Sequence, residues 1–145
     1  MGFLQKFFHI VDKRLETKRF TKFCLVGLSG VGVNLGLLWV LTEYLGLYYL
    51  LSAFFSVEIS ILTNFTLNEL WTFSDRVNDR SAKPLLVRAT KFNIISAGGL
   101  VINIAILGIL TEFFGVYYII SELFGIGGAT MWNYLANMAI TWGRS

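Results

Sequence analysis

The second half of this chain repeats the first half without a gap, which limits the folds that are open to it. Segment 88–142 aligns with segment 19–73 at a constant offset of 69 residues. The residues Arg19–Phe23, RFTKF, return as Arg88–Phe92, RATKF. A repeat of this kind in an apolar chain predicts a membrane protein built from two copies of one helical hairpin.

The distribution of charge predicts four transmembrane helices. The chain is 55% hydrophobic and 14% charged. Phe23–Thr42 and Phe92–Thr111 contain no charged residue, and each is long enough to cross about 30 Å of hydrocarbon at about 1.5 Å per residue. A short turn and a second long apolar run follow each of them. We therefore expect an all-α integral membrane protein of two tandem hairpins, with helices at 22–43, 49–73, 91–112 and 118–142.

The basic residues predict the orientation of these helices. All 12 Lys and Arg residues fall in the N-terminal arm, around the loop at 74–91, or at the C-terminus. The turns at 43–48 and 112–117 carry only acidic charges, Glu43 and Glu112. Because positively charged segments stay in the cytoplasm, we expect a multi-pass protein of the cell (inner) membrane with both termini inside. The two hairpins then point the same way, and their basic inner face suits anionic lipid headgroups rather than nucleic acid.

Two further segments complete the expected organisation. Apolar residues recur at helical spacing in the N-terminal arm, which predicts an amphipathic helix on the inner membrane surface. These residues are Leu4, Phe7, Phe8, Val11 and Leu15. The expected boundaries are 1–18 for this arm, 19–73 for the first hairpin, 74–87 for a polar cytoplasmic connector that holds the single proline, and 88–145 for the second hairpin.

Four asparagines occupy matching positions in the two repeats: Asn64, Asn68, Asn133 and Asn137. Residues four apart lie on one face of a helix, so each repeat presents a pair of amides near the inner side. The pattern fits a polar pocket open to the cytoplasm, and it equally fits hydrogen bonds to the neighbouring helix. Gly30 and Gly99 on the preceding helices are small, and small residues permit close approach of helix backbones.

Two carboxylates break the repeat inside the second helix. Glu58 lies near its middle and is matched by Gly127, while Glu69 lies eleven residues later on the same face and is matched by Met138. A carboxylate at mid-membrane is costly and normally marks function, so we interpret Glu58 as functional; the alternative is a protonated or hydrogen-bonded packing residue. Glu122 is also unmatched, but it is expected near the outer interface, where charge costs less.

Basic residues recur in pairs at the inner ends of the first and third helices: Arg19, Lys22, Arg88 and Lys91. Such pairs can grip a lipid phosphate. They also serve as ordinary orientation signals, and the sequence alone does not separate the two roles.

The sequence does not predict an enzyme that acts alone. It contains no phosphate-cradling glycine loop, no metal-ligand spacing and no nucleophilic triad. We therefore expect no catalytic residue, no cofactor and no bound metal.

Two motifs resemble the GtrA-like membrane family over residues 19–142. They are RFxKFxxVG at 19–27 and NFxxNxxWTF at 64–73. The resemblance implies four helices in two hairpins. It also implies work beside glycosyltransferases that load a sugar onto a polyprenyl phosphate, in O-antigen glucosylation, in teichoic acid or cell-wall polysaccharide decoration, or in dolichol-phosphate mannose synthesis. Members often carry a basic residue after the second asparagine of the motif, whereas this chain has Glu69.

The resemblance implies a flippase for a polyprenyl-phosphate-linked monosaccharide. In this hypothesis the basic pairs recruit the phosphate, the four asparagines accept sugar hydroxyls, and Glu58 supplies a polar midpoint. Four short helices enclose little volume, so a homo-oligomer or a complex with a membrane-associated glycosyltransferase is expected. Two alternatives stay open: a non-transporting scaffold for the glycosyltransferase, and a small proton-coupled transporter resembling the small multidrug exporters.

Overall fold

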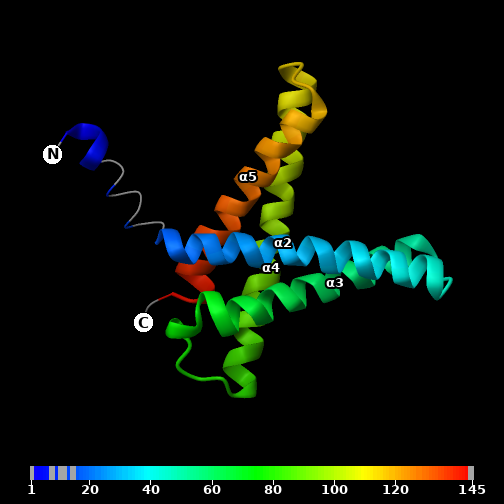
Figure 1. The fold of residues 1–145 in the computed structure, drawn as a ribbon, viewed down its shortest axis with the longest axis horizontal. Helices are drawn as coiled ribbons and strands as arrows, with labels where there is room; N and C mark the ends of the chain where they lie inside the picture. Colours follow the sequence, from blue (N-terminus) through cyan, green and yellow to red (C-terminus); the bar gives the residue numbers. More distant parts are fainter. Residues whose placement is uncertain (1, 7–8, 10–12, 14–15, 144–145) are drawn as a thin grey trace. The chain divides into compact units, whose positions relative to one another are not determined.

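The computed structural model describes residues 2–6, 9, 13 and 16–143. Within these residues the protein is all-helical (Figure 1). The chain divides into two compact units, Met1–Asp75 and Arg76–Ser145, and each unit contains one helical hairpin. The all-helical class and the two hairpins that the repeat predicts are therefore observed.

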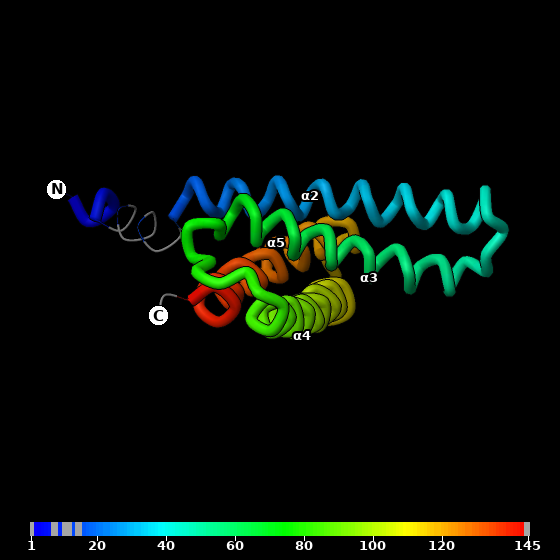
Figure 2. The backbone as a smooth tube through the Cα atoms, turned by 90° about the horizontal axis from the view of Figure 1, so that it is seen from below, coloured from blue at the N-terminus to red at the C-terminus, as the bar shows by residue number. Residues whose placement is uncertain are grey.

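The first hairpin pairs two long helices that each end in a π-helical turn. Its elements are α2 (Thr17–Trp39), η1 (Val40–Tyr44), α3 (Tyr49–Leu67) and η2 (Asn68–Thr72). A short 3-10 turn, η3 (Ser74–Arg76), follows. Figure 2 shows α2 and α3 running side by side and joined at one end.

The second hairpin has the same order of elements. They are α4 (Ala82–Gly108), η4 (Ile109–Phe113), α5 (Tyr118–Ala136) and η5 (Asn137–Thr141). As in the first hairpin, the two long helices pack against each other along their length.

Two helices begin earlier than the sequence predicts. The first starts at Thr17 rather than residue 22, and the third starts at Ala82 rather than residue 91. Pro84, which falls in the connector predicted at 74–87, lies in the first turn of α4. A proline is tolerated there because the first N–H groups of a helix have no partner within the helix. The predicted starts at Tyr49 and Tyr118 are confirmed.

The same glycine ends the outgoing helix of each hairpin. Gly46 has φ 70° and Gly115 has φ 64°, a left-handed conformation that glycine adopts without a steric penalty. The N–H of the next residue then turns back to the helix: Leu47 donates to the carbonyl of Leu41 at 3.0 Å, and Val116 donates to that of Leu110 at 2.9 Å.

An aromatic pair closes the opposite end of each hairpin. The Phe23 and Phe73 rings meet edge to face with centroids 6.4 Å apart, and their repeat counterparts Phe92 and Trp142 do so at 5.9 Å. Phe73 and Trp142 are 0% and 1% exposed. The buried large apolar side chains of each hairpin are therefore concentrated near the end where the first helix begins and the second one finishes.

Most other large apolar side chains are exposed, as expected for helices surrounded by lipid rather than water. Among the described residues, three helices are long and apolar enough to cross a membrane: Thr17–Tyr44, Tyr49–Thr72 and Ala82–Phe113. A fourth long helix, α5 continued by η5, completes the second hairpin.

The expected amphipathic arm lies mostly outside the described residues. Phe7, Phe8, Val11 and Leu15 belong to the undescribed part, while Leu4 lies in a short helical stretch at residues 3–6 and is exposed. The interfacial helix stays a prediction.

Candidate functional site

The amide of Asn64 lies against the backbone of the neighbouring helix in the first hairpin. A β-carbon on Gly30 of α2 would overlap the Asn64 side chain. Ser60, one turn earlier on α3, donates from its hydroxyl to the Gly30 carbonyl at 2.8 Å. Together these contacts hold α2 and α3 at short range, which only a glycine at position 30 permits.

The second hairpin repeats this contact. A β-carbon on Gly99 of α4 would overlap the amide of Asn133 on α5. Beside it, the indole N–H of Trp132 donates to the Ile95 carbonyl at 2.9 Å, above Gly98. The small residues that the sequence analysis placed at the helix contact are therefore in contact with the asparagines, in both repeats.

The inner asparagines differ between the hairpins. Asn137 is fully buried; its amide nitrogen donates to the Asn133 carbonyl at 2.7 Å, and its amide oxygen accepts from the Thr141 hydroxyl at 2.7 Å. In the first hairpin Asn68 and Thr72 are each 2% exposed, yet neither the Asn68 Oδ1 nor the Thr72 Oγ1 has a hydrogen-bond partner among the described residues. The Asn–Thr pair is therefore hydrogen-bonded in the second hairpin but leaves two buried oxygens without a partner among the described residues of the first.

Three asparagines keep a buried amide oxygen without a partner in the described part of the chain: Asn64, Asn68 and Asn133. A buried polar atom without a partner is unfavourable unless a ligand, water or a movement supplies one. These oxygens are acceptors, so the group that completes them is a donor such as a hydroxyl.

The two carboxylates on α3 have different surroundings. Glu69 is 3% exposed within η2, whereas Glu58 is half-buried in the middle of α3. Glu58 is two residues from both Ser56 and Ser60, which are buried in the stripe that faces α2. At about 100° per residue, Glu58 therefore lies on the opposite side of α3 from α2.

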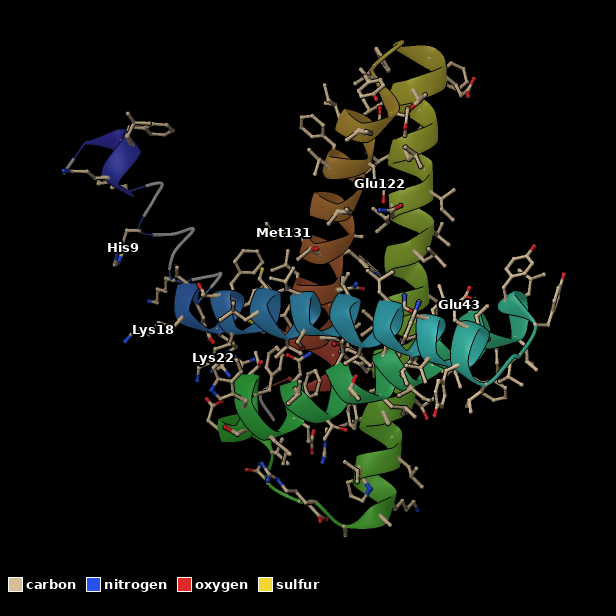
Figure 3. All side chains as sticks on the ribbon, turned by 45° about the vertical axis from the view of Figure 1, so that its right-hand side comes forward. His9, Lys18, Lys22, Glu43, Glu122 and Met131 are labelled. Carbon is tan, nitrogen blue, oxygen red and sulfur yellow. The ribbon has the colours of Figure 1, made fainter. Side chains whose placement is uncertain are left out.

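A third carboxylate, Glu122, lies at a contact between α4 and α5 that was not predicted from the sequence. Glu122 on α5 accepts a hydrogen bond from the Asn103 amide of α4 at 3.2 Å, and Figure 3 shows it on the side of α5 that faces α4. Its second oxygen, Oε2, is buried without a partner among the described residues. The signal for this pair was present in the sequence: Asn103 recurs as Asn34, but the counterpart of Glu122 is Ala53.

The four predicted basic residues do not share one environment. Arg19 donates to the Thr72 carbonyl at 2.7 Å and pairs with Asp75 through two bonds of 2.7 and 2.9 Å, while its Nε pairs with Glu16. The guanidinium also lies 5.4 Å from the centre of the Phe73 ring. Arg19 thus stabilises the end of α3–η2, where a cation complements the helix dipole.

A different arginine caps the second hairpin. Arg76 donates to the carbonyls of Met138 and Trp142 at 3.1 and 3.2 Å. Arg88, the repeat counterpart of Arg19, instead donates to the Asp79 carbonyl at 2.9 Å. The two hairpins therefore close the same helix end with arginines from non-equivalent positions, which the repeat did not predict.

Lys22 and Lys91, the lysines of the two predicted basic pairs, have different surroundings from the arginines. The ammonium of Lys22 lies 5.3 Å from the centre of the Trp71 ring, a cation–π distance, and Figure 3 shows Lys18 and Lys22 along the beginning of α2. Lys91 is exposed on α4.

The loop before α4 is organised by Asp79. The backbone N–H of Ser81 donates to the Asp79 carboxylate at 2.8 Å, and this bond lowers the pKa of Asp79. Together with the Arg88 contact to the Asp79 carbonyl, it fixes the chain immediately before the first turn of α4. Among the described residues, no group of three or more His, Cys, Asp or Glu side chains is placed to hold a metal.

Comparison with known proteins now assigns the chain to a family. The family model described as "GtrA/DPMS, transmembrane domain" matches residues 22–142. The chain belongs to the GtrA/DPMS family. This confirms the resemblance drawn from the two motifs, and it makes the chain a multi-pass membrane protein. Lys22, Arg88, Lys91 and all four asparagines lie inside the matched residues, whereas Arg19 lies outside them.

One curated relative of this GtrA/DPMS member carries a functional name. The chain is 36% identical over 140 residues to a dolichol-phosphate mannosyltransferase of Pyrococcus furiosus. The match covers 97% of this chain but 38% of the relative. The chain therefore spans well under half the length of the relative that it matches.

Proposed function

We propose that this protein moves a polyprenyl-phosphate-linked monosaccharide from the inner to the outer face of the cell membrane, for use in cell-surface polysaccharide glycosylation. The observation that carries the proposal is the match along nearly the whole chain to part of a relative named for transferring mannose to dolichol phosphate. We assign sugar transfer itself to a membrane-associated glycosyltransferase that works beside these helices, and we propose that the helices have no catalytic role.

The proposed membrane arrangement has four spans. α5 crosses the bilayer together with the three apolar helices because it is as long as α3 and occupies the same place in the repeat. Both termini then lie in the cytoplasm, since the helix ends and turns at 43–48 and 112–117 carry only the acidic charges of Glu43 and Glu112. The arm at 1–18 lies on the inner surface.

In the proposed path, the lysines and asparagines act in sequence. Lys22 and Lys91, with help from Arg88, attract the lipid phosphate at the inner surface. Arg19 contributes positive charge there while it holds Asp75. The amide oxygens of the asparagines without a partner accept the sugar hydroxyls when the helices separate, and Asn137 holds Asn133 in place.

Glu58 is the polar midpoint of this path. It lies on the side of α3 that faces away from α2, where a sugar can reach it without opening the first hairpin. A carboxylate accepts hydroxyl hydrogen bonds strongly, and an ionisable residue inside a membrane marks a substrate route. Four helices enclose little volume, so the working unit is a homo-oligomer or a complex with the glycosyltransferase.

The test uses vesicles that contain only the purified chain and a labelled polyprenyl-phosphate sugar. We expect label to reach the opposite leaflet in vesicles with the wild-type chain, and this movement to be lost in Glu58→Ala. Glu112→Gln is the matched control, because Glu112 is an exposed carboxylate in η4 and its loss leaves movement unchanged. Movement equal to that in protein-free vesicles, with the chain folded, contradicts the proposal.

A scaffold that holds the glycosyltransferase without moving lipid is the second candidate. This candidate is favoured because the chain matches only 38% of a relative named as a transferase. A membrane domain beside a transferase can serve simply to anchor that enzyme. Under this function the wild-type vesicles show no movement, while the chain still recruits the transferase to the membrane.

A further inference from the structure

A pocket lies between the two helices of the first hairpin, near the turn that joins them. Its volume is about 460 Å³, and its walls come from the end of α2, from η1 and from the beginning of α3. The lining residues include Leu35, Trp39, Thr42, Glu43, Tyr49 and Ala53. Because the uncharged stretch of the first helix ends at Thr42, the pocket lies at the edge of the hydrocarbon, on the outer side in the orientation proposed above.

The pocket combines apolar walls with aromatic rings and polar groups at its edge. Trp39 is 63% exposed and Tyr49 is 57% exposed, and the Glu43 carboxylate is exposed as well. The Thr42 hydroxyl oxygen is buried and has no hydrogen-bond partner within the described residues. A mostly apolar pocket with a few placed polar groups is the usual form of a site for a small molecule.

Two lining residues of this pocket break the repeat. Trp39 is matched by Gly108, and Ala53 is matched by Glu122. The polar and aromatic lining residues that recur unchanged in the second hairpin are Thr42, Glu43 and Tyr49. Since Tyr49 already gives both hairpins a ring at the membrane interface, a general need for aromatic anchors does not explain Trp39.

The second hairpin fills the equivalent space with a carboxylate of its own. Glu122 accepts a hydrogen bond from the Asn103 amide at 3.2 Å, between α4 and α5. In the first hairpin the matched asparagine is Asn34, and the alanine at position 53 has no polar atom to pair with it. The repeat therefore indicates that an oxygen atom of a ligand takes, in the first hairpin, the place that a Glu122 oxygen takes in the second.

We propose that this pocket binds the sugar of the lipid-linked substrate at the outer face of the membrane. This inference rests on the proposed function, whose path names no residue at its outer end. A sugar ring has faces of C–H groups that pack on an aromatic ring such as Trp39. Its hydroxyl groups donate to a carboxylate such as Glu43 and accept from an amide such as Asn34.

Charge favours the uncharged sugar over a phosphate in this pocket. No Lys or Arg occurs between residues 23 and 75, so the outer end of the first hairpin has no cation of its own to hold a phosphate. Glu43 at the edge of the pocket repels one. A hydrocarbon tail, in turn, leaves the hydrogen-bonding groups of Asn34 and Glu43 without use. A ring that is apolar on its faces and carries hydroxyl groups at its edge matches both parts of the pocket.

The first experiment maps the position of the sugar on the full chain in lipid nanodiscs. Both faces of a nanodisc are open to the solution, so the ligand reaches the pocket without transport. The probe is a short-chain prenyl-phosphate mannose with a photoreactive diazirine on the sugar. We expect label within residues 35–53, and we expect excess unlabelled prenyl-phosphate mannose to remove it while prenyl phosphate without a sugar does not.

Three variants test which residues hold the sugar. Ala53→Glu reproduces the carboxylate of the second hairpin and closes the pocket from within, so we expect label there to fall about tenfold or more while the chain stays folded. Trp39→Leu keeps an apolar wall but removes the ring, and we expect label to fall about fivefold. Tyr44→Leu is the matched control and leaves the label unchanged, because Tyr44 is an 80% exposed ring in η1 that does not line the pocket.

Four results overturn the proposal. The first is label confined to other parts of the chain. The second is an equal loss of label in Trp39→Leu and Tyr44→Leu, which marks both rings as general interface anchors. The third is full labelling of the pocket in folded Ala53→Glu. The fourth is competition by prenyl phosphate as strong as that by prenyl-phosphate mannose, which shows that the hydrocarbon tail occupies the pocket.

The vesicle assay separates failure of this inference from failure of the proposed function. Movement of the lipid-linked sugar in vesicles, with no label in the pocket in nanodiscs, removes this site alone. Label in the pocket without movement in vesicles removes the flippase function and leaves a sugar-binding pocket at this end of the first hairpin.

Discussion

The side-chain amide of Asn64 lies directly against Gly30 of the neighbouring helix, and its repeat counterpart Asn133 lies in the same way against Gly99. The contact is made at a matched position in both hairpins, so it belongs to the hairpin itself rather than to one copy of it. Each asparagine side chain occupies the space that a β-carbon would take if position 30 or 99 held any residue other than glycine.

We predict that Gly30→Ala destabilises the first hairpin. The added methyl group overlaps the Asn64 amide, and overpacking of this kind costs about 1–3 kcal/mol. Gly32→Ala on the same helix is the control, because a β-carbon there meets nothing within 4 Å and alanine favours the helix. The measurement is the thermal unfolding midpoint of the purified chain in detergent; equal midpoints for the two variants contradict the contact.

The turn glycines give a second prediction. Gly46→Ala forces a side chain into a left-handed conformation at φ 70°, which costs about 1–2 kcal/mol. The space around Gly46 is open, so the penalty comes from the backbone alone. We expect Gly46→Ala and Gly46→Ser to lower the unfolding midpoint alike, and Gly46→Asn, which tolerates this conformation better, to lower it less. A larger loss for Asn than for Ala goes against this explanation.

Breaking the Asn103–Glu122 pair has a cost that the first hairpin does not share. Asn103→Leu leaves both carboxylate oxygens of Glu122 without a partner in the hairpin, and an unsatisfied buried group costs about 1–3 kcal/mol or more when charged. Asn34→Leu is the matched control, because Ala53 stands where the second hairpin has Glu122. Unfolding midpoints of the two variants test the difference. Adding Glu122→Gln to Asn103→Leu is expected to restore part of the stability, because it removes the charge that lost its partner.

We expect the same substitution to have opposite effects at Thr72 and Thr141, the buried threonines that end η2 and η5. Thr141→Val removes the hydroxyl that donates to Asn137 at 2.7 Å and leaves a buried oxygen unpaired, at about 1–3 kcal/mol. Thr72→Val removes a buried hydroxyl that has no partner among the described residues, so stability is unchanged or rises. The comparison of their unfolding midpoints decides the matter; a larger loss for Thr72→Val indicates that a ligand or water completes the Asn68–Thr72 pair.

The start of α4 has a pH dependence that follows from Asp79. Its hydrogen bond from Ser81 lowers the pKa of the carboxyl below the ordinary value of 3.8. The ionised form therefore stabilises the turn above that value, and the stabilisation is lost as the pH falls through the lower folded-state value. Hydrogen exchange of the Ser81 amide, corrected for the intrinsic rate, is expected to quicken in that acid range. In Asp79→Asn this acid-dependent step is absent; its persistence there assigns it to another group.

The repeat made the hairpins, their turns and their close helix contacts predictable, because each depends on residues that recur. Gly46 and Gly115, or Gly30 and Gly99, need only local geometry to act. The starts of α2 and α4 were harder to predict, because the polar residues before each apolar stretch are compatible with both a helix and a loop. Pro84 suggested a loop, but it lies in the first turn of α4, where a proline is tolerated.

The candidate site was predicted in its residues but not in their partners. Arg19 and Arg88 match in sequence, yet Asp75 and Glu16 have no counterparts that could hold Arg88 in the same way, and Arg76 takes the equivalent place. The Asn103–Glu122 pair combines a repeated residue with an unrepeated one on different helices. Such a pairing becomes visible only when the helices are placed side by side.

Each of the four long helices ends in a π-helical turn, and these turns begin at Val40, Asn68, Ile109 and Asn137, which are matched positions in the two repeats. A π-helical turn holds one residue more than the α-helical turn it replaces. The residue after the turn closes it: the Phe73 N–H donates to the Asn68 carbonyl at 2.8 Å, and the Trp142 N–H donates to the Asn137 carbonyl at 2.9 Å. The wide turn thus directs Phe73 and Trp142 into the buried aromatic pairs, so the way each hairpin ends its second helix also sets the position of its largest buried ring.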